Sequence, residues 1–450
     1  MDAPATSWEA PLTRWEASPS VATPVLRLNP APSPASNRPR VALIVQKFGG
    51  TSVGTIDRIK NVAARALATQ AAGHSVVVIV SAMSGETNRL LKLASDLTGM
   101  ADGREVDALA ATGEQVTAAL TAIAIQAAGG KARSFLGHQL KVLTDSAFTK
   151  ARIKAIDAQK LMETLASGTI AVVAGFQGVD EEGSITTLGR GGSDTSAVAV
   201  AAAIGAGACE IFTDVDGVYT TDPNICKTAR KIERISYEEM LELASLGAKV
   251  LQIRSVEVAM KYGVPVHVRS SFSDAPGTWV VGEDALESVT VTGVAYDKAE
   301  ARVMLVGVDD EPGMVANIFG ALAAENVGVD MIIQNASSAA HKTDVTFTVN
   351  KTDLAKTRLV MDHIALAVRA TGIAYDEDVA KVSIVGLGMR SHAGVAAQMF
   401  RILADERINI QAISTSEIKV SCLVATRYTE LAVRALHDGF GLGKAPVKQG

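Results

Sequence analysis

Glycine-rich turns beside charged residues are the parts of this sequence that could do chemistry. The first, Lys47-Phe-Gly-Gly-Thr-Ser52, follows an apolar stretch typical of a strand and precedes a helical pattern. Adjacent glycines let the backbone approach an anion, amides at a helix N-terminus point toward it, and a lysine supplies positive charge. Taken alone, the segment fits phosphate binding and a tight turn with an exposed lysine equally well.

A second polar segment, Ser81–Asn88, follows the apolar stretch Ser75–Val80. In open α/β sheets, ligands bind beyond the carboxyl ends of the strands, where this segment would lie. Its Ser84 and Thr87 could also do no more than cap the helix that follows. Both interpretations stay open from these residues alone.

The third segment, Thr187–Ser196, is harder to explain by capping. A cap needs one serine or aspartate, whereas this segment combines Arg190, two glycines, Ser193 and Asp194. The Arg190 guanidinium offers a planar fork of N–H donors to a carboxylate. Asp194 could hold lysine side chains or a metal ion.

A fourth segment, Thr213–Pro223, also follows a strand-like stretch. Tyr219 could stack on a nucleotide base, whereas Asp222 and Pro223 could form only a turn. Farther along, Lys249 stands in an apolar helical stretch, where a lone lysine usually reaches out to solvent. As a set, the segments would hold donor phosphates and a carboxylated acceptor. Because that chemistry depends on positioning and charge neutralisation, the set predicts phosphoryl transfer.

Alternating strand and helix patterns would position these segments. Strands are expected at 41–45, 75–80, 169–174 and 209–213, and helices at 56–72, from 88, at 105–127 and at 193–204. A hairpin is expected within 175–188, turning at Asp180–Gly183. The alternation predicts an α/β fold with a largely parallel sheet.

The composition is that of an ordinary folded protein. Of the 450 residues, 48% are hydrophobic and 20% are charged, with a formal net charge of -5. Without a basic excess, nucleic-acid binding is not expected. Three cysteines cannot form a disulfide framework, which fits a reducing cytoplasm, and the longest apolar runs are too short to span a membrane.

Residues 1–40 differ from the rest, because they hold eight of the 13 prolines. This composition predicts a disordered, Pro-rich N-terminal extension. Acidic residues and the lack of a long apolar core argue against a secretory signal. A plastid or mitochondrial targeting peptide, or a translation start near Val41, remain alternatives.

The last third of the sequence contains an internal repeat. Val303–Gly307 matches Val382–Gly386 at a spacing of 79 residues, and Gly313 matches Gly394 at a spacing of 81. Each copy reads strand, loop, helix, strand, strand, helix, which is typical of a ferredoxin-like βαββαβ unit. The expected domains are 41–282 for catalysis, and 283–375 and 376–450 for the two small units.

Five ordered motifs make the sequence resemble the aspartate kinases of the amino-acid-kinase fold, and the repeat resembles their paired ACT domains. The motifs are Lys47–Val53, Val80–Gly85, Thr112–Glu114, Thr187–Asp194 and Thr213–Pro223, and the resemblance extends from Val41 to about Gly443. It implies phosphorylation of the L-aspartate β-carboxylate by ATP and Mg²⁺. The product would be 4-phospho-L-aspartate, in the first step of lysine, threonine and methionine biosynthesis.

The family's residue roles carry over onto matching positions. The resemblance assigns catalysis to Lys47, Asp194 and Lys249, with the lysines on the phosphates of ATP. It assigns aspartate binding to Ser81, Thr87, Glu114, Arg190 and Ser193, with Glu114 on the ammonium group and Arg190 on the α-carboxylate. It assigns ATP binding to Lys47, Phe48, Gly49, Gly50, Ser52, Gly191, Gly192, Thr213, Asp214, Tyr219, Asp222 and Lys249. Mg²⁺ would bridge the phosphates, and no protein ligand to a metal is expected.

The resemblance also implies feedback inhibition by lysine, threonine or both, bound between ACT domains. The implied effector residues are Asp310, Gly313, Gln334, Asn335 and Ser337 in the first repeat, and Ser414, Thr415 and Glu417 in the second. The second loop reads His392-Ala-Gly394 where the family often has His-Pro-Gly. A homo-oligomer is expected, or a heterotetramer with a shorter ACT-only product that would start at Met260, Met304 or a non-Met codon.

Two other functions fit parts of the same pattern. A kinase for N-acetylglutamate, glutamate or UMP would share the fold, but a free ammonium group needs a carboxylate such as Glu114 whereas an acetylated amine does not, and the tandem ACT pair also favours aspartate. A non-catalytic amino-acid sensor would be favoured by loss of Lys47, Arg190 or Asp194, and all three are present.

Overall fold

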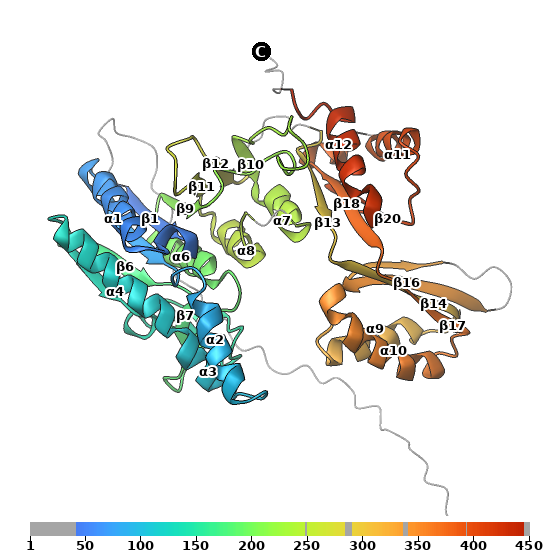
Figure 1. Cartoon of the computed structure of the whole chain (residues 1–450), viewed down its shortest axis with the longest axis horizontal. Coiled ribbons are helices and arrows are strands. Elements are labelled where there is room, and N and C mark those ends of the chain that lie inside the picture. Colours follow the sequence, from blue (N-terminus) through green and yellow to red (C-terminus); the bar gives the residue numbers. More distant parts are fainter. Residues whose placement is uncertain (1–41, 248–249, 284–289, 336–340, 393, 445–450) are drawn as a thin grey trace, which may run out of the picture. The chain divides into compact units, whose positions relative to one another are not determined.

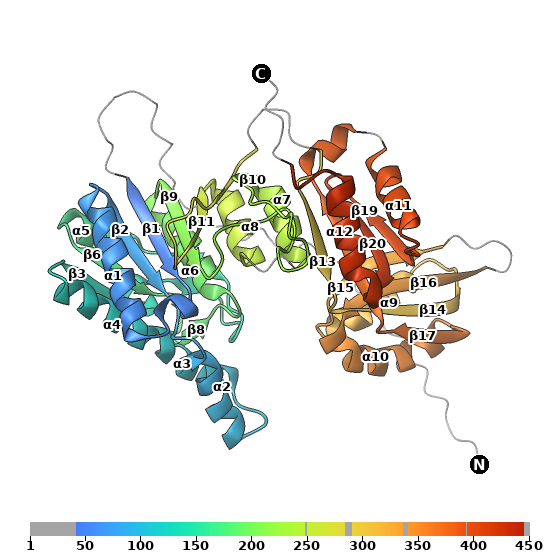
Figure 2. The same cartoon turned by 45° about the horizontal axis from the view of Figure 1, so that its top comes forward.

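An eight-stranded sheet lies at the centre of the catalytic part of the chain. The computed structural model describes residues 42–247, 250–283, 290–335, 341–392 and 394–444. The strand order is β10-β12-β11-β9-β1-β2-β6-β3 (Figures 1 and 2). The strands are β1 (Leu43–Phe48), β2 (Ser75–Val80), β3 (Ala132–Phe135), β6 (Ile170–Ala174), β9 (Ala208–Thr213), β10 (Arg234–Ser236), β11 (Val266–Ser270) and β12 (Thr278–Val281). Among the described strands of this sheet, only β11 and β12 pair antiparallel, which confirms the predicted α/β fold with a largely parallel sheet.

Helices cover both faces of this sheet, because its central strands are apolar on both sides. The helices of the catalytic part are α1 (Ile56–Ala71), α2 (Glu86–Leu97), α3 (Gly103–Ala110), α4 (Thr112–Ala127), α5 (Gln159–Ala166), α6 (Gly192–Ile204), α7 (Tyr237–Ser245) and α8 (Ile253–Tyr262), of which α2 and α3 lie away from the sheet. Helices α1 and α4 lie side by side and share one apolar cluster with Val76, Val78 and Val80 (Figures 1 and 2). Helices α5, α6 and α8 share the opposite cluster with Val77 and Ile79.

Two predicted elements differ in detail. The helix expected over 105–127 is two helices, α3 and α4, which meet at Ala111. Helix α2 begins after Gly85, a left-handed N-cap (φ 83°), so neither Ser84 nor Thr87 caps it. By length and composition alone Gly103–Ala127 could cross a membrane, but half of its most apolar stretch is buried inside the protein.

A smaller sheet holds the predicted hairpin. Its order is β5-β4-β7-β8, formed by β4 (Leu143–Thr144), β5 (Ile153–Ala155), β7 (Gln177–Val179) and β8 (Ile185–Thr187). Strands β7 and β8 pair antiparallel, as expected. The turn between them is fixed by the Asp180 carboxylate, which accepts hydrogen bonds from the Glu182 and Ser184 amides.

The first repeat forms a complete βαββαβ unit. It comprises β14 (Glu300–Asp309), α9 (Met314–Ala324), β15 (Val329–Gln334), β16 (Lys342–Asn350), α10 (Leu354–Ala367) and β17 (Gly372–Asp376). Its sheet has the order β15-β16-β14-β17. The strand β17 therefore closes the unit that β14 began.

The second repeat obtains its fourth strand from elsewhere in the chain. It comprises β18 (Val379–Val385), α11 (Val395–Asp405), β19 (Ala412–Thr415), β20 (Lys419–Ala425) and α12 (Thr429–Gly439). The fourth strand is β13 (Gly293–Asp297), which pairs antiparallel with β18 in the order β13-β18-β20-β19. The expected boundary at residue 283 placed this strand with the first repeat, whereas its pairing places it with the second.

Candidate active site

Three of the polar segments singled out in the sequence, those after β1, β2 and β9, emerge side by side at the carboxyl ends of the parallel strands, and the third segment, which follows β8, reaches the same edge through Asp194. Backbone hydrogen bonds join the residue after one strand to the end of its neighbour: Gly49 N to Phe212 O (3.3 Å), Ser81 N to Phe48 O (3.1 Å) and Ser271 N to Thr213 O (2.8 Å). The parallel register that these bonds continue brings segments far apart in the sequence to one edge. Ligands of open α/β sheets bind at such an edge.

A buried ion pair marks the centre of this edge. Lys47, near the end of β1, places its Nζ 2.7 Å from Asp194 Oδ1, and the two side chains are only 10% and 13% exposed. Asp194 lies in the first turn of α6, whose N-cap is Gly191 in the left-handed region (φ 72°), without a side-chain cap. A helix N-terminus without a side-chain cap beside a buried lysine favours an anion such as phosphate.

The glycine turn after β1 is tightly packed, which is why glycine is needed there. A Cβ on Gly50 would lie 2.9 Å from Ala82 O. Ser52, in the 3-10 helix η1 (Gly50–Val53), is buried, and its Oγ lies 2.5 Å from Ser271 Oγ. Phe48 stacks on Phe212 with ring centroids 4.7 Å apart, so the backbone of this turn is held against the sheet.

Glu114 lies in the first turn of α4 and is 3% exposed. Its Oε1 accepts a hydrogen bond from Ala82 N (3.0 Å), while Oε2 is buried without a hydrogen-bond partner among the described residues. Burial raises the pKa of Glu114 to about 7, although the bond from Ala82 opposes that rise. A buried carboxyl with one free oxygen suits a ligand that brings a positive charge.

Arg190 and Ser193 flank the start of α6. Ser193 is buried, and a Cβ on Gly175 would lie 2.9 Å from its Oγ, whereas Arg190 is exposed. No local sequence pattern indicates Arg254 on α8, the residue that supports this turn. Its guanidinium donates to Leu188 O (2.5 Å) and Ala151 O (2.9 Å), and only the fold brings them together.

The remaining predicted aspartate-site residues lie near the same edge. Ser81 directly follows β2, and Thr87 is in the first turn of α2. Lys249 lies outside the described residues, so its predicted contact with phosphate stays a prediction.

A pocket of about 530 Å³ lies next to the fourth segment. Its lining includes Asp214, Tyr219 and Asp222, and Thr213 ends β9 just before them. The Tyr219 hydroxyl donates to Asp216 Oδ1 (2.9 Å), so the ring is fixed along the wall. Unexpectedly, β13 of the second repeat also lines this pocket, through Val294, Ala295 and Tyr296.

The expected effector residues of the two repeats lie in comparable places. Gly313 is the left-handed N-cap of α9, and Gln334 Nε2 donates to Asp310 Oδ1 (3.4 Å). Asn335 directly follows β15, and Ser337 lies outside the described residues. In the second repeat, Ser414 and Thr415 end β19, and Glu417 lies in the turn before β20.

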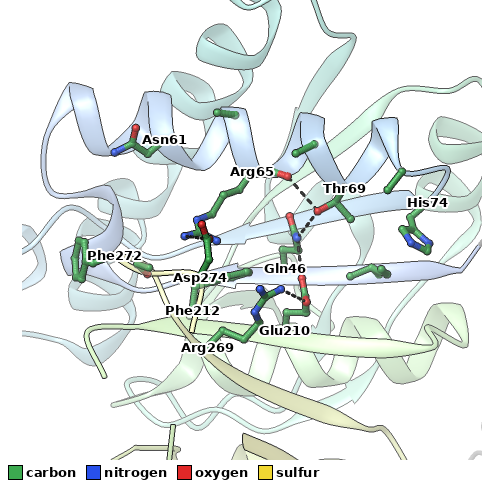
Figure 3. A pocket seen from close by; sticks show the side chains of 15 residues that line it. Gln46, Asn61, Arg65, Thr69, His74, Glu210, Phe212, Arg269, Phe272 and Asp274 are labelled. Carbon is green, nitrogen blue, oxygen red and sulfur yellow. Dashed lines mark hydrogen bonds and ion pairs between the residues drawn. The ribbon is translucent and has the colours of Figure 1, made fainter. Parts of the chain in front are cut away.

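A separate pocket of about 810 Å³ lies between α1 and the middle of β1, β9 and β11 (Figure 3). Its charges pair with one another: Arg269 Nη1 with Glu210 Oε1 (2.9 Å) and Arg65 Nη2 with Asp274 Oδ1 (3.1 Å). Burial alone would raise the pKa of Glu210, but hydrogen bonds from His267, Gln46 and Arg269 and the Arg269 charge lower it to about 2. Because these charges are already paired, the pocket does not offer a phosphate site.

Comparisons with known proteins agree with this arrangement. Residues 42–270 match the model of the amino acid kinase family, and residues 303–362 and 382–440 match that of the ACT domain. An aspartate kinase of Pseudomonas putida is 54% identical over 412 residues, which are 91% of this chain and 100% of that protein.

Solved structures show the same relationship. E. coli aspartokinase III in complex with aspartate and ADP, in the R-state, matches with a TM-score of 0.74 and 26% identity, covering 88% of this chain and 99% of that chain. The same enzyme in complex with lysine and aspartate, in the T-state, matches with a TM-score of 0.72 and 26% identity, covering 89% and 99%.

Proposed function

This chain belongs to the aspartate kinases of the amino acid kinase family and carries ACT regulatory domains, and we propose that it transfers the γ-phosphoryl group of ATP to the β-carboxylate of L-aspartate. The observation that supports this most directly is the buried Lys47–Asp194 pair at the N-terminus of α6. The product would be 4-phospho-L-aspartate, with ADP as the other product.

The acceptor needs no general base. A carboxylate oxygen of aspartate is already anionic, so it can attack the γ-phosphorus directly while the bond to the bridging oxygen breaks and ADP leaves. The protein must bring two anions together and neutralise the charge that spreads over the transferring group. Lys47 would do so, with Asp194 holding its ammonium in place and Lys249 as a second cation. The turns at Gly49–Gly50 and Gly191–Gly192 would let the phosphate oxygens approach the backbone, with the Gly50 and Gly191 amides as donors.

Aspartate would lie between the second and third segments. The unpartnered Glu114 Oε2 supports a role in binding the substrate ammonium, and Arg190 and Ser193 would bind its α-carboxylate. Ser81 and Thr87 would complete this part of the site. On the other side, Asp214, Tyr219 and Asp222 would hold the adenosine part in the pocket of about 530 Å³.

Mg²⁺ would neutralise and orient the β- and γ-phosphates. A protein ligand to the ion would be a carboxylate, and the carboxylate of Asp194 beside Lys47 already pairs with that lysine. Magnesium readily keeps its waters and binds through substrate phosphates. The donor set therefore suits an ion that arrives with ATP.

The ACT domains would bind the effector. We propose that lysine, threonine or both bind there and inhibit the enzyme as end products of lysine, threonine and methionine biosynthesis. The proposed binding residues are Asp310, Gly313, Gln334, Asn335 and Ser337 in the first repeat. The matching segment of the second repeat holds Ser414, Thr415 and Glu417. The proposed domains are 41–282, 283–375 and 376–450, with β13 reassigned to the last. A cytoplasmic oligomer would fit this role, as a homo-oligomer or with a shorter ACT-only chain.

Trapping of the acyl phosphate tests this function. Hydroxylamine converts an acyl phosphate to a hydroxamate, so ATP- and Mg²⁺-dependent hydroxamate formation from aspartate is expected. N-acetylglutamate, glutamate and UMP, tested in parallel by ADP release, should be poor acceptors. Addition of lysine and threonine, alone and together, should suppress the signal. Turnover of another acceptor in preference to aspartate would refute the substrate, and the absence of any turnover in folded protein would favour a sensor.

A further inference from the structure

Strand β13 is hydrogen-bonded both to the second repeat and to a loop of the catalytic part. On one edge it pairs with β18 over Gly293–Asp297. On the other edge, Val294 N donates to Thr220 O (2.8 Å), in the loop that carries Tyr219 and Asp222. A regulatory sheet is thereby joined by a backbone hydrogen bond to a loop of the catalytic part.

The side chain of Tyr296 strengthens this join. Its hydroxyl donates to Asp222 Oδ2 (3.0 Å), while Asp222 Oδ1 accepts from Asn224 N (2.8 Å). Burial and the bond to Asp222 raise the pKa of Tyr296 to about 12, so the phenol keeps its proton at neutral pH. Tyr296 thus orients the carboxylate on which the turn at Asp222 is built.

Close packing against a second loop points the same way. Gly247 has φ 102°, and a Cβ on it would lie 2.5 Å from Tyr296 O. Gly247 and Val250 line the same pocket as Tyr296. A shift of β13 would therefore displace the lining on two sides of this pocket.

Helix α12 holds the loop from another direction. His437 is fully buried, and its Nε2 lies 3.0 Å from Thr220 Oγ1. The same hydroxyl accepts from Arg230 N (3.0 Å), which closes the base of the loop. Burial lowers the pKa of His437, so the neutral ring can form a hydrogen bond with the Thr220 hydroxyl.

We propose that the second repeat is itself part of the nucleotide site, with Tyr296 and His437 as positioning residues that hold the loop Tyr219–Arg230 against ATP. This inference rests on the proposed assignment of the pocket to the nucleotide. In the described part of the chain, the hydrogen bond of the Glu114 side chain goes to Ala82, away from β13 and α12. The second repeat would therefore set the affinity for ATP and leave that for aspartate unchanged.

Tyr296→Phe tests the proposal, because it removes one hydroxyl and little else. Loss of a hydrogen bond to a carboxylate predicts a rise of about five- to tenfold in KM for ATP and in Kd for ADP measured by calorimetry. The kcat and KM for aspartate should change less than about twofold. The control Tyr428→Phe, in the same repeat but outside the pocket lining, should behave as wild type. An unchanged affinity for ADP in Tyr296→Phe would overturn the role of Tyr296.

A pair of variants tests His437. His437→Leu should raise KM for ATP, whereas His437→Gln, which can present an amide near the position of Nε2, should restore it to within about threefold of wild type. Equal losses in both variants, in kcat and in melting temperature alike, would show a purely structural role. Tyr219→Ala and Asp222→Ala test the assignment of the pocket to the nucleotide separately from the role of the second repeat. If they leave ATP affinity unchanged, the nucleotide assignment itself fails, and if only they lower it, the second repeat has no part in the site.

Discussion

Two regions of the molecule are each built around a buried lysine, and they use it differently. In the catalytic part, Lys47 meets a single carboxylate, Asp194, at the edge of the sheet. Between the repeats, Lys381 on β18 meets two carboxylates, Glu300 on β14 and Asp330 on β15. Lys381 is 5% exposed and Glu300 8%, so their charges neutralise each other away from water.

The difference indicates which buried charge is free to act on a ligand. Burial would lower the pKa of Lys381, but the charges of Glu300 and Asp330 raise it, so this lysine stays charged and its charge is more than offset by the two carboxylates. Lys47 lies instead beside glycine turns that a phosphate could approach. A lysine enclosed by two carboxylates repels an anion and joins two parts of a protein, whereas a lysine paired with one carboxylate beside an open turn can bind an anion.

Lys47→Ala should give the largest effect and would set one end of the comparison. Removing a cation that stabilises the transferring phosphoryl group should lower kcat by about a thousandfold or more. The fold should stay intact, although the melting temperature should fall somewhat, because Asp194 Oδ1 is buried and loses its cation. Steady-state kinetics and a thermal melt measure both, with the exposed Lys60→Ala on α1 as control. Near-normal kcat would remove Lys47 from the mechanism.

Lys381→Met should show the opposite behaviour. It leaves Glu300 buried without its cation, which should destabilise the repeats by about 3 kcal/mol. Basal kcat should stay close to wild type, while inhibition by the effector should weaken because the junction between the repeats is loosened. Chemical denaturation and inhibition curves measure these effects, with the exposed Lys356→Met as control. If Lys381→Met abolished catalysis as Lys47→Ala does, the two lysines would not differ in kind.

The sequence could predict the first region far better than the second. Lys47 and Asp194 stand in glycine-rich segments, so local spacing marks them as candidates for anion binding, and the resemblance to the aspartate kinases assigns their roles. Lys381 stands alone in an apolar strand, and its partners Glu300 and Asp330 lie 81 and 51 residues away. No local pattern encodes a contact that only the packing of two repeats creates.

Strand β13 was missed for a related reason. The repeat predicted two equivalent units in sequence order, but the second repeat ends with α12 and takes its fourth strand from before the first. Pairing of distant strands depends on which sheet edge is open, which periodicity does not reveal. The same holds for Arg254, which supports the turn at Leu188 from 66 residues away.

Glu114 offers a third buried charge, and its prediction concerns pH. With a pKa of about 7, Glu114 is largely protonated below neutral pH in the free enzyme, and the ammonium of aspartate should bind only the ionised form. The value of kcat/KM for aspartate should therefore fall about tenfold per pH unit below about 7. Glu114→Gln should raise KM for aspartate about 10- to 100-fold and abolish this pH dependence.

The stability of the free enzyme should change with pH in the opposite direction to kcat/KM. Because the folded state holds the Glu114 proton to a higher pH than the unfolded chain does, this group lowers the free energy of unfolding as pH rises from about 4.5 to about 7. Kinetics and denaturation across pH 5.5–8 check both signs, with the exposed Glu105→Gln on α3 as control. A pH profile of Glu114→Gln that matched wild type would show that another group titrates.

The smallest expected effect is a change in effector sensitivity, and it distinguishes the two repeats from each other. Gln334 ends β15 beside the carboxylate of Asp310, and Thr415, 81 residues later, ends β19 in the second repeat. The loop that matches Asp310–Gly313 holds His392 and Gly394 but no acid, so it offers no carboxylate to the ammonium of an amino acid. Gln334→Ala should therefore raise the effector concentration for half-inhibition about threefold to tenfold, with basal kcat unchanged. Thr415→Ala should leave it within about twofold, which inhibition curves with lysine and threonine would show. Equal shifts in both variants would mean that both repeats sense the effector, and the division of labour between a sensing first repeat and a second repeat that holds the nucleotide loop would be wrong.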